Sequence, residues 1–270
     1  MTHLAEGSGI LISHQGNARI LTLARPEALN AIHPEMVEAI NRALEEAAMD
    51  SSCTALVITG QGRSFCAGAD LKAAKQRAEK GQDGGRNDAQ DFVRSVTNLM
   101  NKIEEFPCPV IAAVQGLALA GGLELVLCCD LVIATEGAKF GDAHANFGLL
   151  PGGGGSIRLP RKIGAARAKQ LMFTGEMLPA STLYEWGLVN QVVADSDLSE
   201  AIGSLISKLS TKSPIGLRQM KRLVNQGLQM QVKDALELEQ QVFAEHAKTY
   251  DRHEGLAAFA ERRTPHFRGC

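Results

Sequence analysis

The chain has 270 residues, of which 45% are hydrophobic and 21% are charged. This composition is that of a folded globular protein long enough to bury a large core. The formal net charge of −2 gives no electrostatic reason to expect binding to nucleic acid or to an anionic membrane surface. We expect no signal peptide, because no basic stretch followed by an apolar one begins the chain, and no membrane span, because no apolar run is long enough.

The cysteines indicate a reducing compartment. They are Cys53, Cys66, Cys108, Cys128, Cys129 and Cys270. None belongs to a C-x-x-C pair, and the two adjacent ones point in different directions in either regular structure. We therefore expect reduced core thiols in a cytoplasmic or matrix protein, rather than disulfides or metal ligands.

The first sixty residues alternate strands with one amphipathic helix. Residues 10–26 predict two strands around a turn at 15–17, and the second strand alternates clearly. A helix begins at Pro34, with apolar residues on one face and glutamates on the other. Residues 54–60 form a short apolar strand. Strand, helix and strand at this spacing predict a right-handed crossover and a partly parallel sheet.

The segment GRSFCAGADL (Gly62 to Leu71) is rich in small residues. Ala67, Gly68 and Ala69 would let an extended ligand lie against the backbone and bond its free N–H groups. The alternative is a tight loop in which Asp70 caps a following helix.

A polar stretch, residues 75–90, then contains three glycines. It is either a solvated surface connector, the commoner case, or a lid over a binding site. An amphipathic helix follows, and Pro107 and Pro109 end it before a buried strand at 110–114.

The stretch from Gly116 to Asp130 is nearly all apolar, and Glu124 is the single acid inside it. A lone carboxylate in such a run costs free energy unless it is paired, protonated or used in chemistry. A helix that opens near Gly121 would leave its first N–H groups without partners inside the helix. The segment thus offers donors for an oxyanion and, one turn later, a carboxylate base. The alternative is a buried helix whose glutamate bonds to neighbouring backbone.

Residues 131–135 predict another strand, and four glycines at 152–155 precede a helix. No Walker lysine is in register, so this is not a P-loop, and no G-x-G-x-x-G follows a strand to support a Rossmann site. We expect the glycines to let the chain pass close to another segment. A helix, a turn, a second helix and a short strand reach residue 193, and from residue 198 the sequence is helical.

Five motifs stand in order: RPEALNAI, SFCAGADL, PVIAAVQGLALAGGLELVLCCDLVIAT, AKFGDAHANFGLLPGGGGSIRLPRKIG and, near the C-terminus, EGLAAFAERRTPHF. In these motifs the chain resembles the crotonase superfamily, the enoyl-CoA hydratase and isomerase family, over essentially its whole length. The resemblance implies an α/β fold. A crotonase-type spiral of ββα turns with the acyl-CoA site would span residues 1–197, and a helical region that builds trimers, often paired into hexamers, would span 198–270.

The resemblance also implies an acyl-CoA thioester substrate, with coenzyme A carried as part of that substrate and no metal or redox cofactor. The thioester oxygen would lie between the backbone N–H groups of Ala69 and Gly121. Fixed donors at such a position stabilise an enolate-like transition state by about 3–4 kcal/mol each. Hydratases of the family hold a water between two glutamates. The first matches Glu124, but the second falls on His144; Asp142 is two positions away and cannot replace it if its side chain points elsewhere.

These residues predict hydration of a 2-enoyl-CoA to a 3-hydroxyacyl-CoA. Glu124 would be the base, and His144 would hold the water or return a proton to the α-carbon; alternatively His144 is a pocket-wall residue bonded to backbone. In isomerases of the family the essential acid matches position 144, which argues against a simple isomerase. Loss of the second glutamate still leaves isomerase, hydrolase or dehalogenase chemistry open. A non-catalytic CoA- or RNA-binding scaffold is a third possibility, and the net charge disfavours RNA.

Four residues are candidates for coenzyme A contacts. Ala67 lies in the small-residue loop, and Lys72 follows it where the family often has a basic residue near the nucleotide. Phe243 and Arg262 match C-terminal positions that contact the adenosine or 3′-phosphate end, from a neighbouring subunit. Glu27 replaces the lysine of the family's R-P-K-A-L-N, so one phosphate contact is missing. The alternatives are solvated surface charge for Lys72 and Arg262, and core packing for Phe243.

Overall fold

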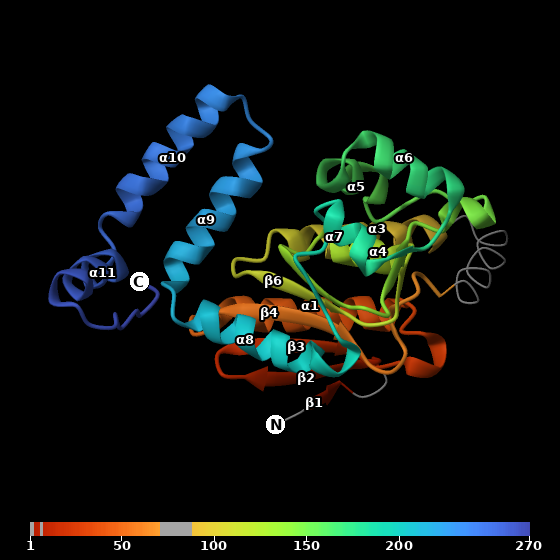
Figure 1. Ribbon diagram of the computed structural model, residues 1–270, viewed down its shortest axis with the longest axis horizontal. Helices are drawn as coiled ribbons and strands as arrows, with labels where there is room; N and C mark the ends of the chain where they lie inside the picture. The colour runs from red at the N-terminus through yellow and green to blue at the C-terminus, as the bar shows by residue number, and fades with distance from the viewer. Residues whose placement is uncertain (1–2, 6–7, 71–87) are drawn as a thin grey trace.

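The computed structural model describes residues 3–5, 8–70 and 88–270. The predicted contact of Lys72 and most of the polar stretch at 75–90 lie outside these residues. The described strands form one sheet of seven strands and one of four, shown in Figure 1. The larger sheet contains, in spatial order, β1 (His3–Ala5), β2 (Ile10–Gln15), β3 (Ala18–Leu23), β4 (Ala55–Gly60), β6 (Val110–Val114), β8 (Leu131–Thr135) and β11 (Gln191–Val193). The smaller sheet contains β10 (Leu178–Pro179), β9 (Lys139–Gly141), β7 (Leu117–Leu119) and β5 (Ser64–Cys66).

Helices surround and extend these sheets. The α-helices are α1 (Pro34–Met49), α3 (Asp88–Glu104), α4 (Gly121–Leu127), α5 (Gly155–Ile163), α6 (Ala165–Thr174), α7 (Ala180–Glu185), α8 (Leu198–Ser210), α9 (Pro214–Gly227), α10 (Val232–His246) and α11 (Tyr250–Glu261). Short 3-10 helices are η1 (Pro26–Ala28), η2 (His144–Phe147) and η3 (Asp195–Asp197).

From β4 to β9, consecutive strands alternate between the two sheets, and this builds the spiral. The pairs β4–β5, β6–β7 and β8–β9 each place one strand in the larger sheet and the next in the smaller one, and a helix follows each pair. Strands β3, β4, β6, β8 and β11 are parallel neighbours, as are β5, β7 and β9. The predicted spiral of ββα turns is therefore confirmed. Because parallel strands end at the same edge of a sheet, the loops after β5 and β7 lie side by side.

The central strands of the larger sheet are apolar throughout because both faces are buried. Alternate residues of β4 face two different clusters: Leu56 and Ile58 belong to the main core, and Val57 belongs to a second cluster on the other face. Helix α8 closes that second cluster through Ile206. The division predicted at residue 197 falls at the start of α8, so the first helix after it packs on the core sheet.

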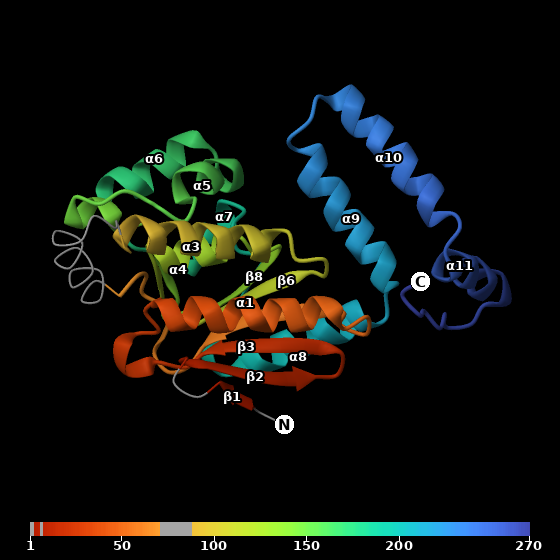
Figure 2. The same cartoon turned by 180° about the vertical axis from the view of Figure 1, so that it is seen from behind.

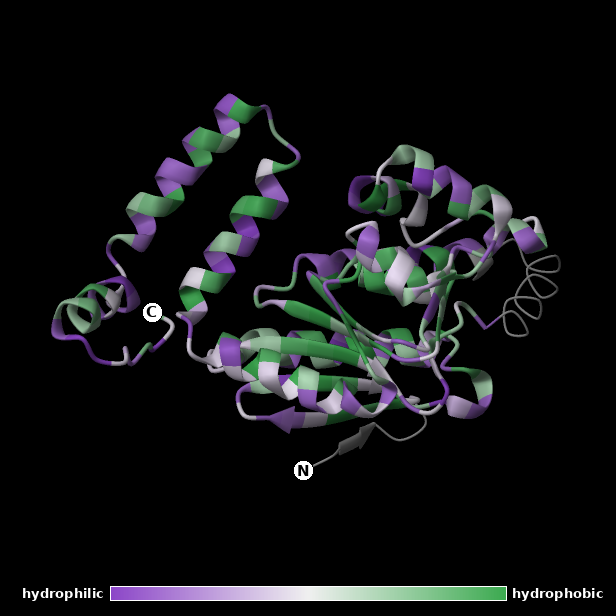
Figure 3. Ribbon diagram, in the orientation of Figure 1, coloured by the Kyte–Doolittle hydropathy of each residue, from purple (hydrophilic) through white to green (hydrophobic). Residues whose placement is uncertain are grey.

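Helices α9, α10 and α11 form an arm that stands away from the core in both Figure 1 and Figure 2. In the C-terminal half of α9, Lys221 Nζ lies 2.7 Å from Asp130 Oδ2, and Asn225 Nδ2 donates to the Glu104 carbonyl at 3.2 Å. The helices of the arm contain hydrophobic residues, coloured green on the ribbon in Figure 3, and several of these residues are exposed. They include Met220, Val224, Leu228, Val232, Leu236, Phe243, Leu256 and Phe259. In the described part of the chain, no helix combines the length and apolar character that crossing a membrane requires.

Candidate active site

The loop after β5 lies against the N-terminus of α4. Ile32 N donates to Gly68 O at 2.8 Å, and Asp70 N donates to Ile32 O at 3.0 Å. These two bonds flank Ala69, so its own N–H points away from Ile32. A Cβ placed on Gly121 would lie 3.5 Å from Ala69 N. The structure therefore brings the Ala69 and Gly121 backbones together, as the sequence predicted.

A close helix–strand approach positions Gly121. A Cβ on the next residue, Gly122, would collide with the Cys66 carbonyl oxygen, so only glycine lets α4 start against β5. Ala120, just before the helix, has a φ of 49°. First-turn N–H groups have no partner within a helix. Across the described residues, neither Ala69 N nor Gly121 N donates a hydrogen bond to another segment. Both amides remain available to one acceptor.

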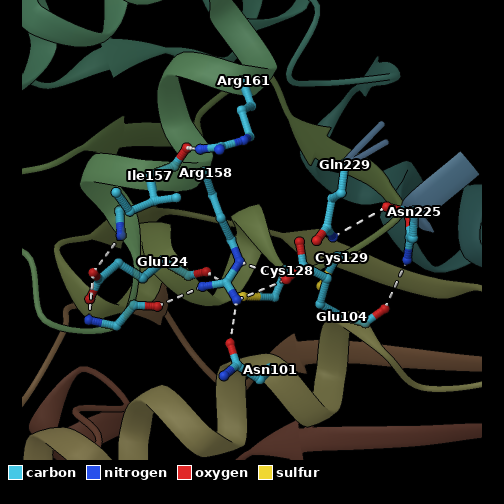
Figure 4. A network of polar contacts seen from close by, with 12 residues as sticks. Asn101, Glu104, Glu124, Cys128, Cys129, Ile157, Arg158, Arg161, Asn225 and Gln229 are labelled. Atoms are coloured by element: carbon cyan, nitrogen blue, oxygen red, sulfur yellow. Dashed lines mark hydrogen bonds and ion pairs between the residues drawn. The ribbon is translucent and has the colours of Figure 1, made fainter. Parts of the chain in front are cut away.

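Glu124 lies one turn into α4 and is only 3% exposed. Its Oε1 accepts hydrogen bonds from Gly153 N and Gly155 N, both at 2.8 Å, as Figure 4 shows. Gly155 begins α5, so the carboxylate also faces the positive end of a helix dipole. No hydrogen bond from the described residues reaches its other oxygen, Oε2. The two oxygens thus differ: one is fixed by backbone, and one is open to a reacting proton.

Burial raises the pKa of the Glu124 carboxyl above its ordinary value. The hydrogen bonds from Gly155 and Gly153 and the nearby charge of His144 offset part of this rise, while the charge of Asp142 adds to it. A carboxylate whose pKa is raised toward neutral pH is a better general base than an exposed one.

The glycine run after η2 passes directly beneath this carboxylate. A Cβ on Gly153 would lie 2.8 Å from Glu124 Oε2, and one on Gly155 would lie 3.1 Å from Oε1. Gly154 has a φ of +102°, which favours glycine. The prediction that this run allows a close approach is confirmed, and the approaching group is the Glu124 side chain.

His144 begins η2 and forms a contact with Asp142. Its Nδ1 lies 3.1 Å from Asp142 Oδ1, and the two side chains are 12% and 2% exposed. Burial lowers the pKa of His144, but the hydrogen bond and charge of Asp142, together with the charge of Glu124, outweigh it and raise the pKa above its ordinary value. A ring whose Nδ1–H faces a carboxylate directs Nε2 elsewhere as its functional nitrogen. The Asp142 carboxylate therefore faces the imidazole of His144 and fixes its orientation.

The enoyl-CoA hydratase/isomerase family matches this sequence over residues 14–270. The chain belongs to this family. The resemblance to the crotonase superfamily that the motifs indicated is confirmed.

Relatives cover nearly the whole chain. The 2,3-dehydroadipyl-CoA hydratase of Escherichia coli (strain K12) is 38% identical over 262 residues, 97% of this chain and 99% of that protein. The crotonyl-CoA hydratase of Syntrophomonas wolfei is 34% identical over 259 residues, 96% of this chain and 97% of that protein. The crystal structure of an enoyl-CoA hydratase from Bacillus anthracis superposes with a TM-score of 0.90 at 34% identity, covering 97% of this chain and all of that one.

Of the four residues predicted to contact coenzyme A, Lys72 lies outside the described residues, and the other three lie on different parts of the fold. Ala67 directly follows β5, and its N–H donates to Leu29 O at 3.0 Å. Phe243 lies on α10 and is 61% exposed, and exposed Arg262 follows α11. Both lie in or directly after the helices of the arm, which stands away from α4 in Figure 1.

Sequence reasoning left open that Glu124 bonds to backbone, as one of its oxygens does, but it did not identify Gly153 and Gly155 as the donors or Asp142 as the partner of His144. The Asp-x-His spacing is a signal for such a pair, but it places the two side chains together only in some backbone conformations. Ala143, between them, has a φ of 58°, which a sequence pattern does not predict for alanine.

Proposed function

We propose that this enzyme adds water to a 2-enoyl-CoA to give a 3-hydroxyacyl-CoA. The observation that carries the proposal is a buried carboxylate, Glu124, one turn beyond a pair of adjoining free amides, Ala69 N–H and Gly121 N–H. Hydration of an enoyl thioester needs both features, because water must lose a proton as it attacks the β-carbon and negative charge develops on the thioester oxygen.

The thioester oxygen binds between the two amides. As water adds, the carbon–carbon double bond shifts its electrons toward the carbonyl and the oxygen gains charge. Donors that are already in place cost no reorganisation at that moment, and each contributes about 3–4 kcal/mol to the transition state. The bridge between Ile32 and Ala69 and the close contact of Gly122 with Cys66 keep these donors fixed.

Glu124 takes the proton from water through Oε2, while Gly153 and Gly155 hold Oε1. His144, protonated and paired with Asp142, gives a proton to the α-carbon. The hydroxyl group derived from water is then bonded to the β-carbon, and the bond between the α- and β-carbons has become a single bond. Transfer of the proton from Glu124 to neutral His144, directly or through water, restores both groups.

Relatives with hydratase names support this reaction over its alternatives, and so does the presence of the first of the two family glutamates. The replacement of the second by His144 is what keeps hydrolysis, dehalogenation and isomerisation as outcomes to test. Each of these would use the same pair of amides on a CoA thioester, but would leave a different product.

We propose that the functional form is a homotrimer or a pair of trimers. The apolar residues exposed on the arm support this, because a surface of that kind on three successive helices favours a protein partner. Phe243 and Arg262 would then contact the coenzyme A bound by a neighbouring subunit. Replacement of Val224 and Leu228 by glutamate should give monomers in light scattering, with KM for the CoA thioester raised about tenfold by the loss of about 1.4 kcal/mol. Unchanged trimers would contradict this assembly.

The proposed reaction is tested by incubating the protein with crotonyl-CoA and identifying the product by mass spectrometry. Hydration predicts loss of the conjugated enoyl-thioester absorbance and a product one water heavier, with no free coenzyme A thiol. Release of the thiol would indicate hydrolysis instead. Absence of any reaction with crotonyl-CoA and with longer and dicarboxylic enoyl-CoA esters would contradict the proposed function.

A further inference from the structure

We propose that Arg158 is a positioning residue for Glu124, acting through the turn formed by Gly153, Gly154 and Gly155. This inference rests on the proposed role of Glu124 as the base. Arg158 touches neither the carboxylate nor the two amides assigned to the thioester oxygen. Its hydrogen bond to the Gly153 carbonyl holds the peptide group that lies between the two peptide groups whose N–H bonds hold Glu124 Oε1.

The guanidinium joins the glycine turn just before α5 to α3, a helix whose bonded residues lie 54 and 57 positions earlier in the sequence. Arg158 Nη1 donates to the Gly153 carbonyl at 2.8 Å. Its Nε and Nη2 both donate to Glu104 Oε2, at 3.0 and 2.8 Å. Nη2 also donates to Asn101 Oδ1 at 2.7 Å. Figure 4 shows Arg158 between the turn and the two residues of α3. A planar fork with donors on all three nitrogens suits this arrangement, and a lysine does not.

The glycine turn needs contacts with residues outside it to fix its conformation. Three consecutive glycines have a high conformational entropy in the unfolded chain and no side chains to pack. Gly154 sits in the left-handed region, and a Cβ there would collide with Arg158 Nη1. The guanidinium therefore lies directly against the turn. Because the Gly153 carbonyl and the Gly155 N–H belong to consecutive peptide groups, fixing the first limits the orientation of the second.

The positive charge of Arg158 is matched within the same network. Burial lowers the pKa of Arg158, but the hydrogen bond and charge of Glu104 and the charge of Glu124 outweigh it and raise the pKa. The side chain of Arg158 is 12% exposed, and that of its ion-pair partner Glu104 is 42% exposed. Glu104 thus balances the cation, and the main effect on Glu124 is geometric.

Loss of the hydrogen bond from Arg158 to the Gly153 carbonyl has two consequences for the reaction. The Gly153 and Gly155 N–H groups lower the pKa of Glu124, so weaker bonds from them move the acid limb of the kcat profile to higher pH. The carboxylate also loses its fixed orientation. A displacement of about 1 Å in a catalytic group costs up to about 100-fold in rate. Substrate binding depends on other residues, so KM should change little.

The kinetic test compares Arg158→Met and Arg158→Lys with Arg161→Met. Arg161 lies one turn further along α5, is exposed, and donates to Ile157 O at 2.7 Å. We expect Arg158→Met to lower kcat by about 10- to 100-fold with KM within about twofold, and its acid limb to lie at higher pH. Arg158→Lys should fall between it and the wild type, because one ammonium cannot bond both Gly153 and Glu104 in the same way. Arg161→Met should match the wild type.

A second measurement does not depend on catalysis. Hydrogen–deuterium exchange of a peptide covering residues 149–157 should be faster in the Arg158 variants than in the wild type and in Arg161→Met. If Arg158→Met does not fold, Arg158→Lys and Glu104→Gln give the same comparison in milder form. If the wild type hydrates no enoyl-CoA but the Arg158 variants exchange faster than it does, the result would support the role of Arg158 in fixing the glycine turn and reject the proposed function. Unchanged exchange and an unchanged pH profile in an active enzyme would overturn the role of Arg158.

Discussion

The two sides of the site are held in different ways. Glu124 is fixed by backbone: it lies on a buried helix, and two glycine N–H groups bond one of its oxygens. His144 is fixed by a single side chain, Asp142, at the start of a short helix that also carries exposed Phe147. The pKa values of both are raised, but burial raises that of Glu124, whereas Asp142 raises that of His144 against the effect of burial.

This difference indicates which of the two groups, Glu124 or His144, is more sensitive to substitution of neighbouring side chains. A group held by main-chain donors keeps its place when neighbouring side chains vary. A group held by one carboxylate depends on that carboxylate for its position and its charge. Position 144 is also where the sequence motifs predict a departure from the two-glutamate pattern of the family's hydratases. We infer that the His144 side sets the particular chemistry and the Glu124 side is common to the fold.

Removal of the base should have the largest effect. Glu124→Gln keeps an oxygen for the Gly153 and Gly155 amides but cannot take a proton from water. We expect kcat for hydration to fall by about 1,000-fold or more, within the range of a lost general base, with KM changed little. The assay is loss of enoyl absorbance, and exposed Glu105→Gln is the matched control. A decrease of less than tenfold would mean that another group removes the proton.

Removal of the imidazole should have the next largest effect and a distinct pH signature. His144 must be protonated to supply a proton, so wild-type kcat/KM should decline as pH rises through its raised pKa. In His144→Gln we expect a rate loss of about 100-fold and disappearance of that alkaline limb. His253→Gln, at an exposed position on α11, is the control. An alkaline limb that survives in His144→Gln would assign it to a different group.

Substitution of Asp142 should produce a smaller change with the same pH signature. The carboxylate raises the pKa of His144, so in Asp142→Asn the imidazolium should lose its proton at a lower pH. We expect the alkaline limb to move to lower pH and the maximal rate to decline about tenfold, the lower end of what removing a group that orients a catalytic residue costs. If the limb does not move, Asp142 has only a structural role.

The smallest expected effect is that of Glu124→Gln on thermal stability. The folded-state pKa of Glu124 lies above its unfolded value. The stabilisation that the protonated Glu124 carboxyl gives to the folded state is therefore fully present below the unfolded-state pKa. It is lost as pH rises through the folded-state pKa. At pH 7 Glu124→Gln should melt about 2–4 °C above the wild type, the shift that about 1 kcal/mol produces in a domain of this size, and the gap should narrow toward pH 4. A lower melting temperature at pH 7 would contradict a cost of burying this charge.

Much of the site could be predicted from sequence because it is local. Glu124 stands out as one acid in an apolar run. The small residues around Ala69 and Gly121 indicated accessible backbone, and the family resemblance then singled out these two positions. The glycine run at 152–155 was expected to pass close to another segment, and it does. In each case the signal is a residue type that is costly or unusual in its immediate surroundings.

The remaining features depend on information that a local pattern does not contain. Strands β5, β7 and β9 have three residues each, too few for an alternation to be visible. The contact between Asp142 and His144 depends on the left-handed backbone at Ala143. The amides at Gly153 and Gly155 meet Glu124 across about thirty residues, and only the packing of α4 against α5 brings them there.

The most direct test of the central claim measures exchange of the α-protons of butyryl-CoA with deuterated water. This saturated thioester cannot be hydrated, but the oxyanion amides and a group at the α-carbon suffice to exchange its protons. Our account predicts exchange in the wild type, its loss in His144→Gln, and its survival in Glu124→Gln. Exchange that is lost with Glu124 and retained without His144 would reverse the two roles and contradict the account.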